Sequence, residues 1–190
     1  MQMKKKYPLS LTKQIIIDIP FDEIENGKVY AYDELIIKYI NGEDEYILFK
    51  DFVVTGFNLI ESLFQKALAN SLKIDHSKFP KGIGYEWVVI SHAIAEEEIE
   101  LEDITSPYRL WTTPSYLARS TWIYNDGEKS YIEISPEYRW DYNDPEEGEC
   151  FESFDSFVER YDCLENIEID KEILEEILNE IEEVAKKIYY

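Results

Sequence analysis

Residues 34–54 read ELIIKYINGEDEYILFKDFVV, and this stretch decides the predicted fold. Two largely apolar runs, Glu34–Ile40 and Tyr46–Val54, flank the polar residues Asn41–Glu45. Because Asn-Gly accepts the positive backbone dihedral angles of a tight hairpin, the stretch predicts two antiparallel strands. The β-branched run Ile15–Ile17 predicts a further strand.

After the hairpin, the spacing of apolar residues becomes that of a helix. Gly56 marks a predicted break, and Asn58 with Glu61 resembles a capping box, in which each side chain satisfies a free backbone N–H group. Beyond them, apolar residues recur every three or four positions, which predicts a central helix packed across the hairpin. This apolar stripe consists of Ile60, Leu63, Phe64, Ala67, Leu68 and Leu72.

The middle of the chain predicts more strands. Tyr85–Ser91 is typical of a buried strand, since it is a short apolar run with branched and aromatic side chains. Ala118–Tyr124 and Ser130–Ser135 predict a second hairpin around the turn Asn125–Glu128.

Two helices are predicted near the carboxyl end. Phe151–Tyr161 carries an aromatic stripe, and Lys171–Ile188 has an apolar face opposite a face made almost entirely of Glu, with Asp170 placed as its cap. Only Pro145–Gly148 resembles a linker, and the roughly forty residues beyond it are too few for an independent domain. We therefore predict one α+β domain over residues 1–190. Its antiparallel sheet is built from two hairpins and packed by the central helix and the C-terminal helices.

The composition excludes several classes of protein. The chain has 190 residues, 45% of them hydrophobic, which suffices for a buried core. It has 41 acidic and 19 basic residues, so its formal net charge is −22. This charge repels phosphate backbones and anionic membrane surfaces, and it attracts basic protein surfaces and cations. We therefore expect neither nucleic-acid nor membrane binding.

The compartment is predicted from what the sequence lacks. No apolar run approaches the ~20 residues that span a bilayer. Met1–Lys6 carries lysines, but neither an apolar block nor a small-residue cleavage site follows them, so a signal peptide is not predicted. We expect a cytoplasmic protein in which Cys150 and Cys163 are free thiols.

The acidic residues are concentrated in one part of the chain. Residues 141–183 contain 18 acidic and two basic residues, a net charge of −16, whereas the remainder has a net charge of −6. Glu172 and Glu176, like Glu176 and Glu180, are like-charge pairs at the i,i+4 spacing, each of which costs a few tenths of a kcal/mol in a helix. Two interpretations stay open: a solvated surface that favours solubility, or a face that binds a basic partner.

Residues that could carry catalysis are few. Asp75, His76 and Ser77 are the types found in a catalytic triad, but adjacent side chains point in different directions. His92 and Glu96 would form half of a metal site only on a helix, and the strand prediction favours a buried, hydrogen-bonded histidine. No zinc, EF-hand or phosphate-loop spacing occurs. We predict no catalytic residue, cofactor or metal, and a carboxylate- or metal-dependent hydrolase stays an alternative.

The candidate binding residues combine aromatic and acidic side chains. Aromatic residues are dense between Tyr108 and Tyr142; Trp122 is assigned to the core, while Tyr138 and Trp140 lead into the acidic segment and are candidates for contact. The predicted partner-binding set is Tyr138, Trp140, Asp141, Asp144, Glu146, Glu147, Glu149, Glu172, Glu175, Glu176 and Glu180.

Three segments carry a resemblance to other proteins. Trp111–Leu117, Ser120–Tyr124 and Ile132–Trp140 resemble a pattern in uncharacterised small bacterial proteins, where a Thr-Pro segment leads into a Trp-bearing hairpin that ends in Ser-Pro and two aromatic residues. The likeness covers at most a third of the chain and implies a hairpin with its flanks and no active site.

The chain as a whole is similar in general character to immunity proteins of bacterial polymorphic toxin systems. Such proteins are small, acidic, cytoplasmic and α+β, and they neutralise basic nuclease toxins by covering the active site. This likeness implies an inhibitor whose acidic face docks on a basic toxin nuclease. The alternative within the same class is an inhibitor of a defence protein that mimics nucleic acid through carboxylates spaced like phosphates.

Overall fold

The computed structural model describes residues 2–20, 28–96, 101–114, 116–141, 144–145 and 148–189. Two four-stranded antiparallel sheets account for most of the strands. The first sheet has the order β1 (Gln2–Pro8), β2 (Lys13–Pro20), β4 (Glu34–Asn41), β5 (Asp44–Phe52). The second has the order β6 (Arg109–Thr112), β7 (Arg119–Asp126), β8 (Lys129–Pro136), β9 (Glu165–Ile169). A short parallel pair joins β3 (Val29–Tyr30) to β10 (Ile188–Tyr189).

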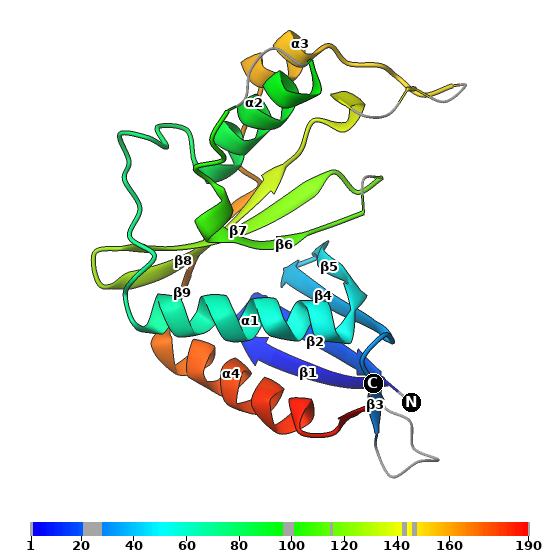
Figure 1. Cartoon of the computed structure of the whole chain (residues 1–190), viewed down its shortest axis with the longest axis vertical. Helices are drawn as coiled ribbons and strands as arrows, with labels where there is room; N and C mark the ends of the chain where they lie inside the picture. Colours follow the sequence, from blue (N-terminus) through cyan, green and yellow to red (C-terminus); the bar gives the residue numbers. More distant parts are fainter. Residues whose placement is uncertain are drawn as a thin grey trace.

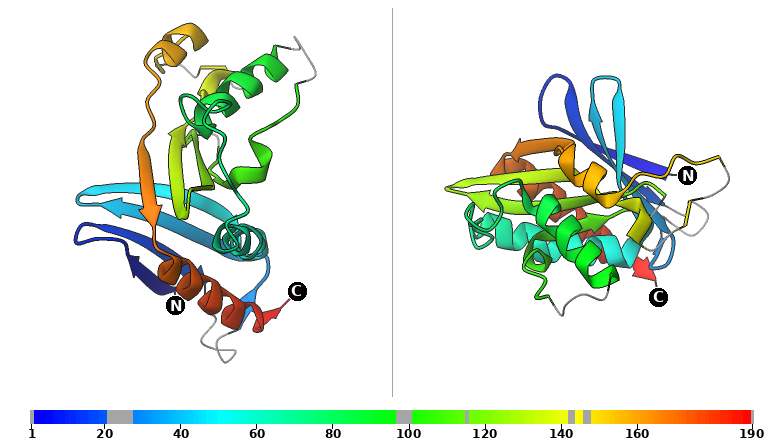
Figure 2. Two further views of the ribbon diagram at one scale, coloured as in Figure 1. Left: turned by 90° about the vertical axis from the view of Figure 1, so that its left-hand side faces the viewer. Right: turned by 90° about the horizontal axis from the view of Figure 1, so that it is seen from above.

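The helices lie in two groups. The α-helices are α1 (Val53–Leu68), α2 (Ile83–Ala95), α3 (Phe154–Glu159) and α4 (Lys171–Ala185), with short 3₁₀ helices η1 (Ser106–Tyr108) and η2 (Arg139–Asp141). Figure 1 shows α1 and α4 side by side in front of the first sheet, while α2 and α3 lie at the opposite end of the molecule. The views of Figure 2 show β9 running between these two ends.

One buried cluster joins both sheets. It includes Ile17 and Ile37 of the first sheet, Ile132 of the second, Phe64 of α1 and Ile177 of α4. A smaller cluster under α2 consists of Phe79, Ile83, Trp122 and Tyr124. The second sheet is therefore covered on one face by the main core and on the other by α2.

The predicted α+β class and both predicted hairpins are confirmed. Leu35, Ile37 and Tyr39 alternate along β4 with no exposed surface, which is the period expected of a strand with one buried face. The hairpins nevertheless lie in separate sheets, whereas the sequence predicts one. Each hairpin is completed by strands that the sequence pattern does not assign to it: β1 and β2 for the first, β6 and β9 for the second.

The buried strand predicted at Tyr85–Ser91 is wrong, because these residues belong to α2. The first free N–H groups of α2 donate to a carboxylate of the second sheet: those of Ile83 and Gly84 lie 3.1 and 2.7 Å from the Glu133 oxygens. Negative charge at this position is favourable because the helix N-terminus carries a partial positive charge. Since Glu133 is 49 residues from Gly84 in the sequence, no local pattern reveals this cap.

The break predicted at Gly56 is also wrong, because α1 begins at Val53 and contains it. A Cβ atom on Gly56 would lie 2.5 Å from Leu35 Cδ2 and 2.8 Å from Phe49 Cε1, so the missing side chain lets α1 pack closely on the hairpin. Asn58 lies inside the helix and cannot act as its cap. The helix ends at Leu68, before Leu72.

The last quarter of the chain is confirmed in part. Both helices form, although α3 is shorter than predicted, and Asp170 occupies the N-cap of α4 without a side-chain hydrogen bond. The strand β9 between them was not predicted. None of the helices in the described ranges combines the length and apolar character needed to cross a bilayer.

Candidate functional site

The solvent-facing side of α4 carries the α4 acidic surface, which we define as Asp170, Glu172, Glu175, Glu176 and Glu182. All five residues are exposed. The opposite side of the helix is buried in the main core through Leu174, Ile177 and Ile181. Within the described residues, none of the five carboxylates forms an ion pair. The helix thus combines a fixed apolar anchor with a row of exposed carboxylates that form no ion pair in the described structure.

Neighbouring elements extend this surface at the start of α4. A shallow hollow of about 210 Å³ is lined there by Glu128 of the β7–β8 turn, Glu168 of β9, and Asp170 and Glu172 of α4. The Lys129 ammonium lies 2.8 Å from the Glu168 carboxylate, so only part of the negative charge is compensated. The β7–β8 turn thus meets the junction of β9 and α4, about forty residues further along the chain.

The chain around α3, near the start of the acidic segment, lies elsewhere, at the α2–α3 end of the molecule (Figure 1). The Glu149 carboxylate contacts the Arg139 guanidinium at 2.6 Å, and Glu152 forms a two-bond ion pair with Arg160. The Arg160 hydrogen bonds hold the pKa of Glu152 below its usual value. This end therefore compensates part of its negative charge within the chain.

His92 is the centre of an aromatic cluster at the same end. Its Nδ1 lies 2.6 Å from an Asp141 oxygen, its ring stacks on Phe154 with centroids 3.6 Å apart, and Tyr138 meets it edge-on. Burial raises the pKa of the Asp141 carboxyl, and the hydrogen bond to His92 opposes that shift. The cluster joins α2, η2 and α3, so it is a packing element of this end.

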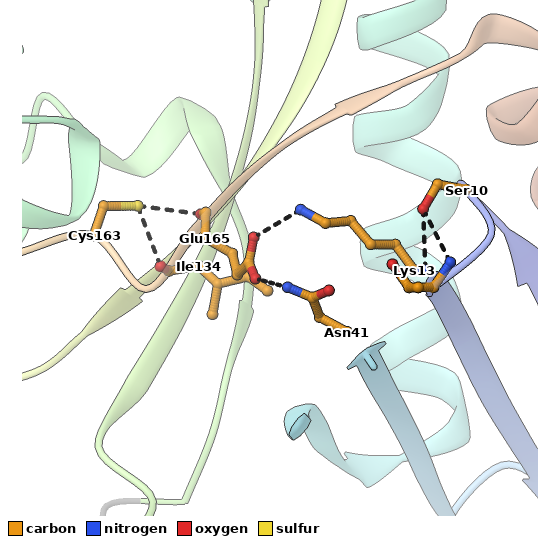
Figure 3. Close-up of polar contacts among 7 residues, drawn as sticks. Ser10, Lys13, Asn41, Ile134, Cys163 and Glu165 are labelled. Atoms are coloured by element: carbon orange, nitrogen blue, oxygen red, sulfur yellow. Dashed lines mark hydrogen bonds and ion pairs between the residues drawn. The ribbon is translucent and has the colours of Figure 1, made fainter. Parts of the chain in front are cut away.

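Two further carboxylates of the acidic segment hold the sheets and helices together. In Figure 3, the Glu165 side chain of β9 reaches across to the first sheet, where Lys13 Nζ lies 3.2 Å away and Asn41 Nδ2 donates at 2.6 Å. The Glu180 carboxylate of α4 accepts hydrogen bonds from Lys5 Nζ at 2.9 Å and from the Tyr7 hydroxyl at 2.5 Å. Glu180 thus fixes α4 to β1.

The structure does not bring the predicted binding residues onto one surface. Glu172, Glu175 and Glu176 lie together on α4, and Asp144 is exposed at the other end. Five predicted residues have partners within the chain, in ion pairs, hydrogen bonds or ring contacts: Tyr138, Trp140, Asp141, Glu149 and Glu180. Glu146 and Glu147 lie outside the described residues.

Tyr138 and Trp140 have different surroundings. The Tyr138 hydroxyl donates to the Glu152 carbonyl oxygen at 2.8 Å, so its ring and its polar end are both held within the fold. Trp140 is half-buried beside Phe151 and under the Arg139 guanidinium. Trp122, assigned to the core from the sequence, is confirmed there with no exposed surface.

Chemical groups that could support catalysis are dispersed. Asp75 accepts hydrogen bonds from Ser77, while His76 faces Asp126 at 3.2 Å, so these neighbours do not form a triad. Both cysteines are free, as predicted, and burial raises the pKa of the Cys163 thiol to about 12. His92 lies in α2 and Glu96 is the C-cap of that helix, and no group of three or more metal-ligating side chains occurs among the described residues.

Several residues of the acidic surface were missed by the sequence analysis. Glu128 and Glu168 reach it only because the β7–β8 turn and β9 meet the start of α4. The alternation of polar and apolar residues in Glu165–Ile169 was the available signal for β9. The sequence predicts Asp170 only as the N-cap of the helix α4, and not as part of a binding surface.

Comparison of the chain with protein-family models, with curated proteins and with solved structures finds no match. We therefore infer function from the geometry and charge of the chain's own residues.

Proposed function

We propose that the protein is an acidic inhibitor of the immunity type, which docks the α4 acidic surface on a basic protein partner such as a toxin nuclease. The observation that carries the proposal is the row of exposed carboxylates on α4 without ion pairs in the described structure. A partner that supplies lysine or arginine side chains would remove their mutual repulsion on binding.

The spacing on α4 strengthens this argument. Glu172 and Glu176 are one helical turn apart, and their like charges cost a few tenths of a kcal/mol in an isolated helix. Elsewhere in the same acidic segment, carboxylates contact cations of the chain, as Glu165 contacts Lys13 and Glu152 contacts Arg160. The fold therefore uses several of its carboxylates internally and leaves the α4 row for another molecule.

The rigidity of α4 suits a docking surface. Leu174, Ile177 and Ile181 fix one side of the helix in the core, and Glu180 binds β1 through Lys5 and Tyr7. The carboxylates are consequently carried on a fixed backbone, so less conformational freedom is lost on association than from a loop. Complementary charge also raises association rates, to ~10⁸–10⁹ M⁻¹s⁻¹ in favourable cases at low salt.

The test begins with capture of a basic partner on the immobilised protein from an extract of the organism that encodes it, followed by purification of that partner. Nuclease activity of the partner is then measured with increasing amounts of three proteins. These are the unaltered chain, the triple variant Glu172→Lys, Glu175→Lys, Glu176→Lys, and a control triple variant at the other end, Asp144→Lys, Asp155→Lys, Glu159→Lys.

Both triple variants change the net charge equally and alter only exposed side chains. We expect the unaltered chain and the control variant to inhibit the nuclease at near-stoichiometric amounts, and the α4 variant to need at least about tenfold more protein. Equal loss of inhibition in both variants would reject α4 as the docking surface. A captured partner without nucleic-acid-degrading activity would reject the nuclease assignment.

A further inference from the structure

A hollow of about 370 Å³ is lined by residues of η2 and α3, at the α2–α3 end, and Figure 1 shows this end opposite α4. It is formed by the segment leading into β7, the end of β8, η2 and α3, together with residues of the intervening loops. Its volume is within the range of small-molecule sites, which extends from ~300 to 1,000 Å³. Apolar and aromatic side chains form much of its lining: Leu117, Pro136, Trp140, Phe157 and Leu164.

Three of the chain's four arginines line this hollow, although the protein as a whole is strongly acidic. Arg139 and Arg160 are ion-paired with Glu149 and Glu152. Arg119 has no carboxylate partner within the part of the chain that the structure describes, and its guanidinium lies 5.3 Å from the centroid of the Tyr46 ring. Glu137 also lines the hollow and accepts a hydrogen bond from Trp87 Nε1 at 3.1 Å, so among the described residues Arg119 is the arginine of the hollow that no carboxylate contacts.

The backbone at Arg119 is held in place from both sides. The Thr113 hydroxyl donates to the Arg119 carbonyl oxygen at 2.9 Å and accepts from the Arg119 N–H at 3.1 Å. The preceding residue, Ala118, has a φ of +47°, which is uncommon for a residue other than glycine, and its carbonyl oxygen accepts from the Glu137 N–H at 2.8 Å. Strained residues of this kind persist where surrounding contacts fix them, often at binding sites.

We propose that this hollow binds a small organic carboxylate whose apolar or aromatic body lies against Trp140, Phe157 and Leu164 while its carboxylate pairs with Arg119. The guanidinium plane matches a carboxylate in two parallel hydrogen bonds. The ligand carboxylate would pair with the one arginine of the hollow that contacts no carboxylate in the described structure, and the apolar lining favours an organic acid over an inorganic anion. The site is distinct from the proposed α4 docking surface, so the two proposals can fail independently.

The experiment uses the full chain with phenylacetate as the probe and phenylacetamide, which has nearly the same shape and no charge, as its matched control. Binding is followed by titration calorimetry and by changes in backbone amide NMR signals, with inorganic phosphate as a separate arm. We expect phenylacetate to bind in the millimolar range and to shift the signals of Arg119, Trp140 and Phe157. Phenylacetamide and phosphate should each bind at least about tenfold more weakly, because one lacks the charge and the other the apolar body.

Variants locate the interaction. Arg119→Ala should weaken phenylacetate binding at least about tenfold, and Arg119→Lys should retain an intermediate affinity, since it keeps the charge without the planar fork. Lys50→Ala, which removes a cation from the first sheet, should leave the affinity unchanged. Equal affinity for phenylacetate and phenylacetamide in the unaltered chain would overturn the proposal whatever the folding of the variants. The proposal would also be overturned if the backbone amide NMR signals of the hollow did not shift at up to about 10 mM phenylacetate.

Discussion

The α4 end and the α2–α3 end of the molecule use the same kind of side chain in different ways. At the α2–α3 end, Asp141, Glu149 and Glu152 each contact a cationic group or a histidine of the chain. On α4, Glu172, Glu175 and Glu176 are exposed and form no ion pair in the described structure. A carboxylate that stabilises the fold can thus be distinguished from one that is available to another molecule, although the two look alike in the sequence.

The comparison predicts a graded series of stability effects, and the largest belongs to Glu133. This buried carboxylate accepts from the Ile83 and Gly84 N–H groups and from the Ser135 hydroxyl at 2.7 Å. Glu133→Gln should lower the free energy of unfolding by about 2–3 kcal/mol, because a charge-assisted cap is replaced by a neutral amide with one acceptor oxygen. Urea denaturation measures this change. A loss no larger than that of Glu176→Gln would mean that the carboxylate does not cap α2.

Asp141→Asn should have the next largest effect. The Asp141 carboxylate is nearly buried and faces His92 across 2.6 Å, so the amide would lose a charge-assisted contact within the cluster that joins α2, η2 and α3. Because the substitution also relieves the burial of a charge, which raises the pKa of Asp141, we expect a loss of no more than about 1–2 kcal/mol in urea denaturation. Asp144→Asn, an exposed carboxylate three residues away, is the control and should change the stability little.

Glu180→Gln should lower the free energy of unfolding by less, about 1 kcal/mol near neutral pH, because the ion pair between Glu180 and Lys5 is partly exposed. Burial tends to raise the pKa of Glu180, but hydrogen bonds from Tyr7 and Lys5 outweigh it and lower the pKa. A lowered pKa in the folded state stabilises the protein above the pKa of the unfolded chain, and the contribution is lost as the pH falls through the folded-state value. The stability difference between the two proteins should therefore shrink below about pH 4.5. A constant difference down to pH 2 would contradict the ion pair.

The smallest effect is expected on α4 itself. Replacing Glu172, Glu175 and Glu176 together by Gln should leave the stability unchanged or raise it by a few tenths of a kcal/mol at low salt, since like-charge repulsion is relieved. Thermal unfolding at low and high salt measures this. A marked loss of stability would show that these carboxylates have partners within the fold and are not reserved for another molecule.

The sequence predicts the local elements of this fold better than their assembly. The hairpins and α4 follow from alternation or helical periodicity within one segment. The residues that these periods place on one face are buried accordingly: Leu35, Ile37 and Tyr39 on β4, and Leu174, Ile177 and Ile181 on α4. The helix α2 is not predictable in this way. Its apolar residues form a short run typical of a strand, and the carboxylate that caps it, Glu133, lies far away in the sequence on β8 of the second sheet. The lysine-rich edge strand β1 is recognisable only through its pairing with β2.

The same limit applies to the candidate site. The excess of negative charge between residues 141 and 183 is evident from the sequence, but which carboxylates have partners depends on distant cations. Lys5 and Lys13 come from the first sheet, and they bind Glu180 and Glu165 of the acidic segment. Long-range pairing therefore decides which carboxylates of the acidic segment form ion pairs within the described structure and which do not.

The central claim is that the α4 carboxylates attract a basic protein, and the most direct measurement is the salt dependence of the association rate constant with the captured partner. For the unaltered chain and for the Asp144→Lys, Asp155→Lys, Glu159→Lys control, we predict a steep fall in the rate as salt is raised. For the Glu172→Lys, Glu175→Lys, Glu176→Lys variant, we predict a slower rate at low salt and a much shallower dependence. Parallel salt dependences for the unaltered chain and the α4 variant would contradict the account.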